Sequence, residues 1–163
     1  MNVDAHATVR AARSDDAPTI LSFIRELAIY EAAEHEVVAT ESDIEARLFG
    51  SDANVHALIA EDADGPQGFA VYFLSFSTWL GRHGIFLEDL YVTPAARGAG
   101  IGLLLLKHLA GMAVANGYGR FEWNVLDWNT PAIGFYESIG AKPQSEWIGY
   151  RLEGEALAAF ARA

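Results

Sequence analysis

A strand that leads into a glycine-rich turn and then an apolar helix is the segment of this sequence best suited to chemistry. Residues 87–102 read LEDLYVTPAARGAGIG, with glycines at Gly98, Gly100 and Gly102. Glycine lets backbone N–H groups approach a ligand closely, and the first N–H groups of a helix attract anions because they have no intrahelical partner. The pattern predicts a pyrophosphate site with Arg97 as a cation at its edge. The structural alternative is a turn needed only for tight packing.

Other phosphate, metal and nucleophile motifs fit the sequence poorly. No Gly-Lys-Ser or Gly-Lys-Thr follows a glycine-rich loop, the glycine spacing is not the dinucleotide fingerprint, and no Gly-x-Ser-x-Gly elbow occurs. The chain has no cysteine, which excludes disulfides, thiolate zinc sites and a cysteine nucleophile. The histidines lack the spacing of a zinc site, and we expect no metal. They are His6, His35, His56, His83 and His108.

Two neighbouring carboxylates interrupt an otherwise apolar strand. Glu88 and Asp89 follow Phe86-Leu87 and precede Leu90-Tyr91-Val92. Neighbouring residues of a strand face opposite ways, which predicts that Glu88 shares a face with Phe86, Leu90 and Val92. An ionised carboxylate on an apolar face is costly unless it has a partner or a task. A structural hydrogen bond or ion pair is the alternative to a role in catalysis.

The elements that position these residues alternate between strands and helices. Ser14 is expected to cap a first helix, Thr40 and Asp43 form a capping box, and Asn129 caps a late helix with Pro131 in its first turn. Apolar periodicity predicts strands over 8–12, 55–60, 68–76, 85–92, 120–126 and 146–152, a turn over 62–66, a loop over 77–84, and a glycine-initiated helix over 100–116. The inner face of that helix is expected to contain Ile101, Leu104, Leu105, His108, Leu109 and Met112. A short alanine-rich tail follows the last strand.

Several strands in the middle of the chain follow one another without a helix between them. This order indicates a mixed, largely antiparallel sheet flanked by helices, an α/β fold, rather than a doubly wound parallel sheet. A length of 163 residues suits a single domain over 1–163, and 52% hydrophobic residues indicate a packed core.

Composition also bears on location and partners. No apolar run reaches the roughly 18 residues that a membrane span needs, and residues 1–8 are too polar for a secretory signal. A cytoplasmic location is the default. The net charge of −11 argues against nucleic acid or an anionic membrane as partner and favours cations, although solubility alone also explains it.

Two segments resemble a known enzyme family. Residues 97–102, RGAGIG, resemble the acetyl-CoA signature of the Gcn5-related N-acetyltransferases (GNAT), in which Arg or Gln is followed by x-x-Gly-x-Gly or Ala. Residues 127–140, DWNTPAIGFYESIG, resemble the Asn…Ala…Phe-Tyr…Gly helix of that family. The two segments stand in the family's order and separation, and the likeness covers nearly the whole chain.

Further segments are similar to one branch of this family. The segment 25–31, the loop that contains Trp79, and the strand residues 87–89 together resemble the diamine (spermidine/spermine) acetyltransferases, a branch that includes enzymes acting on thialysine. Trp128-Asn129 adds to the likeness. The resemblance implies a GNAT-like fold, acetyl-CoA as co-substrate, a small amine as acceptor, and a homodimer to which the C-terminal segment contributes.

The resemblance implies which residues hold acetyl-CoA and which carry the reaction. The strand end, Leu90, Tyr91 and Val92, would offer its main chain to the pantetheine arm, with Asn129 beside it. Residues 97–102 would hold the pyrophosphate, and these are Arg97, Gly98, Ala99, Gly100, Ile101 and Gly102. Tyr136 would act as general acid toward the departing thiolate, and Glu88 would deprotonate the ammonium through water, because an amine must lose a proton before it attacks. Asn129 as a plain helix cap and Tyr136 as a core residue are the structural alternatives.

The same resemblance implies an amine pocket rich in carboxylates and aromatic rings, both of which attract alkylammonium groups. Its residues would be Tyr30, Glu31, Trp79, Glu88, Asp89, Glu122 and Trp128. For Tyr30 and Glu31 a solvated helix end is the alternative, for Asp89 a loop anchor, and for the two tryptophans plain packing.

The chain departs from the polyamine enzymes at two places. Glu122 stands where they carry a histidine, and the loop before Ile85 is one residue longer and lacks their acidic residue before Trp79. These differences weaken the case for spermidine or spermine, and a diamine, a lysine-like amino acid, a protein lysine or an antibiotic remains open. A CoA-binding module without turnover is the alternative outside enzymes.

Overall fold

The protein divides into two compact units. In the computed structural model, which describes residues 7–162, the units are Met1–Asn124 and Val125–Ala163. Residues 1–6, which include His6 and most of the polar segment tested for a secretory signal, lie outside the described residues.

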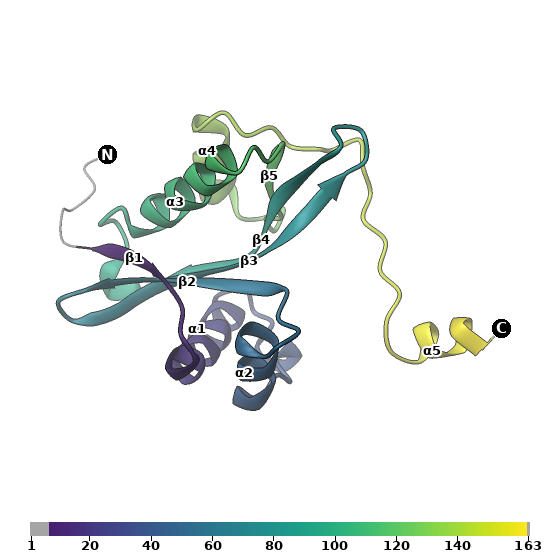
Figure 1. Ribbon diagram of the computed structural model, residues 1–163, viewed down its shortest axis with the longest axis horizontal. Coiled ribbons are helices and arrows are strands. Elements are labelled where there is room, and N and C mark those ends of the chain that lie inside the picture. Colours follow the sequence, from purple (N-terminus) through teal and green to yellow (C-terminus); the bar gives the residue numbers. More distant parts are fainter. Residues whose placement is uncertain (1–6, 163) are drawn as a thin grey trace. The chain divides into compact units, whose positions relative to one another are not determined.

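The first unit is built on a five-stranded sheet of order β1-β2-β3-β4-β5 (Figure 1). Strands β1 to β4 pair antiparallel with their neighbours, and β5 runs parallel to β4. This confirms the predicted mixed, largely antiparallel sheet. The strands are β1 (Thr8–Ala11), β2 (Val55–Asp62), β3 (Gly65–Ser77), β4 (Arg82–Val92) and β5 (Arg120–Trp123). The central strands are longer than predicted, which shortens the expected turn at 62–66 and the loop at 77–84, and β5 is shorter.

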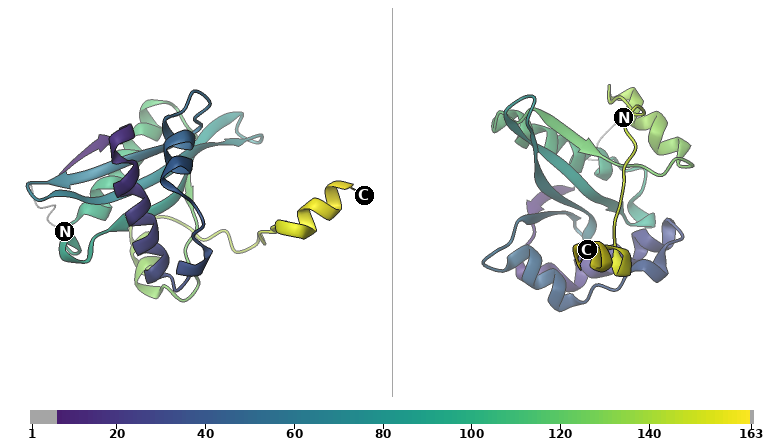
Figure 2. Two further views of the ribbon diagram at one scale, coloured as in Figure 1. Left: turned by 90° about the horizontal axis from the view of Figure 1, so that it is seen from below. Right: turned by 90° about the vertical axis from the view of Figure 1, so that its right-hand side faces the viewer.

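Two helices, α1 (Ala17–Tyr30) and α2 (Glu41–Phe49), cover one face of this sheet, as Figure 2 shows in its left view. Their apolar sides pack on inward-facing residues of β2, β3 and β4. The core on this face contains Ala17, Ile20, Leu21, Phe23, Ile44, Ala57, Ile59, Phe69, Val71 and Tyr91. Burial of these side chains fixes the end of α1 against the sheet near β4.

The entry into α1 differs from the prediction. A short 3-10 helix, η1 (Ser14–Asp16), precedes α1, and Ser14 makes no capping hydrogen bond. Asp16 organises this turn instead, because its carboxylate accepts from the Arg13 N–H at 2.7 Å and from the Arg10 guanidinium at 2.7 and 2.9 Å. The predicted capping box of α2 is confirmed, since the Asp43 N–H donates to Thr40 Oγ1 at 3.2 Å.

Helix α3 (Ile101–Ala115) lies on the opposite face of the sheet (Figure 1). Its buried residues are Ile101, Leu105, Leu106, Leu109 and Ala113. The predicted inner face is thus wrong in part: His108 is exposed, and Leu104 and Met112 are half-buried. The run of apolar residues over 101–106 surrounds the helix, and so periodicity alone could not select the buried side.

The second unit contains α4 (Thr130–Ser138) and α5 (Gly154–Arg162). Asn129 caps α4 as predicted, accepting from the Ala132 N–H at 3.4 Å with Pro131 in the first turn. The strand predicted over 146–152 is not formed, and the alanine-rich tail is helical. An alternating apolar pattern becomes a strand only beside another strand, and no described residue of this unit belongs to one.

Candidate functional site

Strand β4 is irregular at its two carboxylates. Asp89 pairs with Val71, whereas Leu87 pairs with Tyr72, which leaves Glu88 without a partner in β3. This is a β-bulge, in which one extra residue shifts the alternation of the strand. The bulge turns Asp89 toward the face that Val71 shares with α1, and Glu88 is exposed.

The bulge corrects the predicted surroundings of Glu88. Phe86 pairs with Phe73, and Leu90 pairs with Ala70. Phe73 and Ala70 are separated by three positions in a regular stretch of β3, and so they point to opposite faces. Glu88 therefore does not share one face with Phe86 and Leu90, as strict alternation predicted.

Asp89 is the most perturbed carboxyl group of this region. Burial, followed by the negative charges of Glu88 and Glu31, raises the pKa of Asp89 from 3.8 to about 6. Partial burial also raises the pKa of Glu31, at the end of α1. Within residues 7–162 no ion pair neutralises Asp89. The end of α1 and the bulge of β4 thus form a negatively charged site, which suits a cationic ligand.

The strand end that follows the bulge has a free edge. Strand β5 pairs with β4 only across residues 84–87, while β3 follows β4 as far as Val92. Along residues 88–92, the β4 edge on the side of β5 has no strand partner among the described residues. Backbone groups of Leu90, Tyr91 and Val92 are therefore candidates for pairing with an extended ligand.

The glycine-rich turn places a helix start beside this edge. A short 3-10 helix, η3 (Pro94–Ala96), leads into the turn, where Gly98 and Gly100 have φ of 84° and 82°. Gly100 caps α3 without a side-chain hydrogen bond, and a Cβ added to Gly98 would meet no atom within 4 Å. The turn is open, and the first N–H groups of α3 receive no side-chain cap, which fits a pyrophosphate.

Arg97 lies against two aromatic rings. Its guanidinium carbon is 5.3 Å from the centre of the Tyr30 ring and 5.6 Å from that of Tyr91, and its Nε donates to the Val92 carbonyl at 3.0 Å. The Tyr91 hydroxyl donates to the Glu26 carboxylate. Burial and this hydrogen bond raise the pKa of Tyr91 to about 12.

Sequence reasoning missed the side chains of Glu26 and Tyr91. Glu26 precedes Tyr30 by four positions, and residues i and i+4 share a face of a helix. This spacing could therefore have predicted that Glu26 lies beside Tyr30 in the amine pocket. Tyr91 was predicted for its main chain alone.

The remaining predicted pocket residues of the first unit, Glu122 and Trp79, differ in how far their side chains are exposed. Glu122 pairs with Phe86 across β4 and β5, is half-buried, and faces the same side of the sheet as Asp89. Trp79 lies in the β3–β4 turn and is 80% exposed. The structure thus supports a common face for Glu122 and Asp89 and gives Trp79 no such connection.

Three predicted residues belong to the second unit. Tyr136 is half-buried on α4 with its ring 5.7 Å from that of Phe135, and burial raises the pKa of Tyr136. Asn129 caps the same helix, and Trp128 before it is 53% exposed. Their approach to the carboxylates of the first unit stays a prediction.

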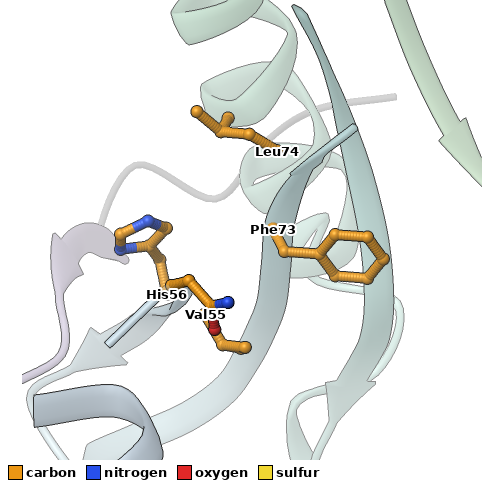
Figure 3. Close-up of a pocket in the computed structure, with 5 residues that line it drawn as sticks. Val55, His56, Phe73 and Leu74 are labelled. Carbon is orange, nitrogen blue, oxygen red and sulfur yellow. The ribbon is translucent and has the colours of Figure 1, made fainter. Parts of the chain in front are cut away.

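A separate hollow lies where β2 begins. It measures about 320 Å³ and is lined by Asn54, Val55, His56, Phe73 and Leu74 (Figure 3). The His56 ring lies 5.3 Å from the Tyr72 ring. No acid or strong cation lines this hollow, and none of the residues predicted for chemistry belongs to it.

Two general features concern metals and membranes. The described residues contain no group of three or more His, Asp or Glu side chains arranged to hold a metal ion. No helix over residues 7–162 is both long and apolar enough to cross a bilayer.

Comparison with known proteins identifies the class as N-acetyltransferase. The chain is 38% identical to the thialysine N-epsilon-acetyltransferase of Mus musculus, over 94% of this chain and 96% of the relative. It is 33% identical to the L-ornithine N5-acetyltransferase of Arabidopsis thaliana, over 93% of this chain and 86% of the relative. A solved integron cassette protein of V. cholerae has the same fold, with a TM-score of 0.82 and 30% sequence identity. The match covers 97% of this chain and 99% of that protein.

The family follows from a direct match. The model of the acetyltransferase (GNAT) family matches residues 23–141. The chain belongs to this family and is therefore an N-acetyltransferase that uses acetyl-CoA as its co-substrate. The predicted branch is also confirmed, because the relatives include the thialysine N-epsilon-acetyltransferase and a spermidine/spermine N(1)-acetyltransferase-like protein of Homo sapiens, which is 35% identical over 88% of this chain and 22% of the relative.

Proposed function

We propose that this enzyme transfers the acetyl group of acetyl-CoA to a primary amine of a small cationic substrate, by direct transfer in a ternary complex. The observation that carries the proposal is the half-buried carboxyl group of Asp89 at the bulge, on the face that Val71 shares with α1, where no ion pair of the described residues neutralises it and where the charges of Glu88 and Glu31 act on it. Such a site favours ammonium groups over neutral or anionic acceptors. The names of the thialysine and ornithine relatives support a lysine-like amino acid within the wider set of diamines and polyamines.

The acyl-CoA would lie along the free edge of β4 and over the start of α3. The main chain of Leu90, Tyr91 and Val92 pairs with the pantetheine arm, and Asn129 contacts it from the second unit. Residues 97–102 surround the pyrophosphate with backbone N–H groups. The open turn at Gly98 and the uncapped start of α3 support this assignment.

Carboxylates at and near the bulge bind the substrate ammonium and remove one of its protons. Asp89, Glu31 and Glu122 bind the ammonium, Tyr30, Trp79 and Trp128 surround its alkyl chain, and Glu88 takes one proton through water. The neutral amine then attacks the thioester carbonyl, whose oxygen is polarised by backbone N–H groups. The C–S bond breaks, and Tyr136 donates a proton to the leaving thiolate. The pKa of about 6 for Asp89 makes it the second candidate for the base.

The proposal extends to the whole protein. Both compact units act as one acetyltransferase domain, since the GNAT match spans their boundary at residue 124. The chain forms a homodimer in the cytoplasm and requires no nucleic acid, membrane or metal partner. A net charge of −11 supports the lack of a nucleic-acid partner.

A substrate panel tests the proposal. Acetyl-CoA-dependent thiol release is measured with thialysine, L-ornithine, lysine, putrescine, spermidine and a lysine peptide, for the wild type, Asp89→Asn, and the exposed-acid control Asp52→Asn. We expect turnover on a small cationic amine, an increased KM in Asp89→Asn, and normal kinetics in the control. Turnover confined to the peptide would contradict the proposed substrate class.

A further inference from the structure

Tyr30 and Tyr91 lie against a cation that belongs to the protein itself. The Arg97 guanidinium is stacked over both rings, at 5.3 and 5.6 Å, and Glu26 accepts from the Tyr91 hydroxyl. A cation within about 6 Å of an aromatic ring centre is attracted by the negative face of the ring. The position that Arg97 fills is therefore a cation site, whichever cation occupies it.

This cation site adjoins both substrates of the proposed reaction. Tyr30 is followed by Glu31, whose charge acts on Asp89, and Tyr91 follows Asp89 by two positions in β4. Arg97 begins the glycine-rich turn, and its Nε donates a hydrogen bond to the carbonyl of Val92 on the free strand edge. One side chain thus covers an aromatic face of the amine pocket and a backbone acceptor of the acyl-CoA edge.

We propose that Arg97 is an internal occupant of the amine site, which it leaves when the pyrophosphate of CoA binds residues 97–102, so that Tyr30 and Tyr91 then receive the substrate ammonium. The inference rests on the acyl-CoA site proposed above. It assigns Tyr30 and Tyr91 to a cation site for alkylammonium groups, and it assigns Arg97 the coupling between the two substrates.

Arg97 is expected to move from the two rings to the pyrophosphate, because its contact with the rings is the weaker of the two interactions. Arg97 is exposed, and a cation–π contact at an exposed position is weak. A guanidinium on a diphosphate makes charge-assisted, often bidentate hydrogen bonds, which are stronger. Movement of Arg97 to the pyrophosphate also releases the Val92 carbonyl for the pantetheine arm. Acyl-CoA binding therefore prepares the amine site, and the amine in turn strengthens acyl-CoA binding by the same factor.

Side-chain NMR tests the movement without any amine. In protein labelled with 15N-arginine, the Arg97 Nε–Hε signal is assigned by its loss in Arg97→Lys. We expect it to be shifted upfield by the two rings, and to move toward the normal arginine position in Tyr30→Leu and on addition of CoA. Pantetheine, which lacks the pyrophosphate, should leave it in place. Bound CoA with an unmoved Arg97 signal would overturn the inference, whereas absence of CoA binding would instead contradict the proposed acyl-CoA site.

Calorimetry tests the coupling with thialysine as probe. In the wild type we expect CoA to tighten thialysine binding about fivefold or more. Arg97→Gln should bind thialysine equally well with and without CoA, close to the affinity of the CoA-bound wild type, while Arg47→Gln on α2 controls for the lost charge and keeps the coupling. Unchanged coupling in Arg97→Gln would contradict the proposal. If Arg97 bound phosphate alone, this variant would lose CoA affinity and leave thialysine binding to the free protein unaltered.

Discussion

Asp89 is held at the sheet face by a bulge rather than by an ion pair. Asp89 is half-buried, and this burial together with the negative charges of Glu88 and Glu31 raises its pKa to about 6, because the fold disfavours the charged form. A protein retains such a group at a cost in folding free energy, which is typical of a binding or catalytic position.

Replacement of Asp89 should stabilise the protein in a pH-dependent way. The folded pKa of about 6 lies above the ordinary aspartate pKa of 3.8, so the folded state loses stability as pH rises from about 4 to 6, and the full penalty is present above pH 6. Asp89→Asn should raise the free energy of unfolding by about 1–3 kcal/mol at pH 7.5 and by less at pH 5. Urea unfolding at both pH values measures this, with Asp52→Asn as control. An equal gain at both pH values would argue against the raised pKa.

Glu88 and Asp89 can be separated by their effects on the pH–rate profile. Glu88→Gln should lower kcat/KM and shift the acidic limb of the profile, because the amine loses its proposed proton acceptor. If Asp89 is the base instead, Glu88→Gln keeps a limb near pH 6, and Asp89→Asn removes it. Profiles of both variants between pH 5 and 9 assign the role.

Replacement of Tyr136 should affect turnover and not the binding of acetyl-CoA. Tyr136→Phe should lower kcat by about 10²–10⁴-fold, the usual range for a general acid, and leave acetyl-CoA affinity nearly unchanged. Turnover and the Kd for CoA are measured on the same preparation. The neighbouring substitution Phe135→Leu controls for disturbed packing of α4, and normal turnover in Tyr136→Phe would refute the proposed acid.

At the scale of elements, the glycine-rich turn and the start of α3 together form the proposed pyrophosphate site. Gly100 has φ of 82° at the helix start, whereas Gly102 lies inside the first turn, where an added Cβ meets Val92 at no less than 3.8 Å. Gly100 is therefore required by the backbone conformation, whereas the structure leaves room for a Cβ at Gly102.

A matched pair of alanine variants tests this difference. Gly100→Ala should cost about 1–2 kcal/mol, because a left-handed conformation is strained for alanine, and it should weaken CoA binding by distorting the turn. Gly102→Ala should leave stability equal or raised by about 0.5–1 kcal/mol. Thermal unfolding and CoA titration measure both variants. Equal losses in the two would contradict a specific role for the turn.

The sequence allowed the elements to be predicted better than their faces. The capping box at Thr40 and the cap at Asn129 are local hydrogen bonds between near neighbours, which a sequence pattern contains in full. The exposure of His108 and the bulge at Glu88 depend on the partner strand and the sheet, which no local pattern contains. The failed strand at 146–152 has the same cause, since alternation describes a strand but supplies no neighbour.

The candidate site was predicted residue by residue from family resemblance and not from spacing. The glycine-rich turn was the exception, because a helix start that binds anions has a local signature. Arg97 contacts Tyr30, 67 positions before it, and Tyr91, 6 positions before it, and no local sequence pattern could predict the longer of these two contacts.

At the scale of the whole molecule, the two compact units should unfold together if they form one functional domain. Differential scanning calorimetry of the full chain should give a single transition, and saturating CoA should raise its Tm, because a ligand of the folded state stabilises it by mass action. Two separate transitions, of which CoA shifts only one, would contradict the single domain.

The bulge in β4 has a consequence for how this protein can change over evolutionary time. Glu88 opposes no residue of β3, while Leu87 and Asp89 on either side keep their ladder partners. A substitution at position 88 therefore alters the charge presented to a substrate without breaking a cross-strand pair. The extra residue separates the proposed proton acceptor from the pairing of the strands, and so the sheet itself places little restraint on which residue stands at this position.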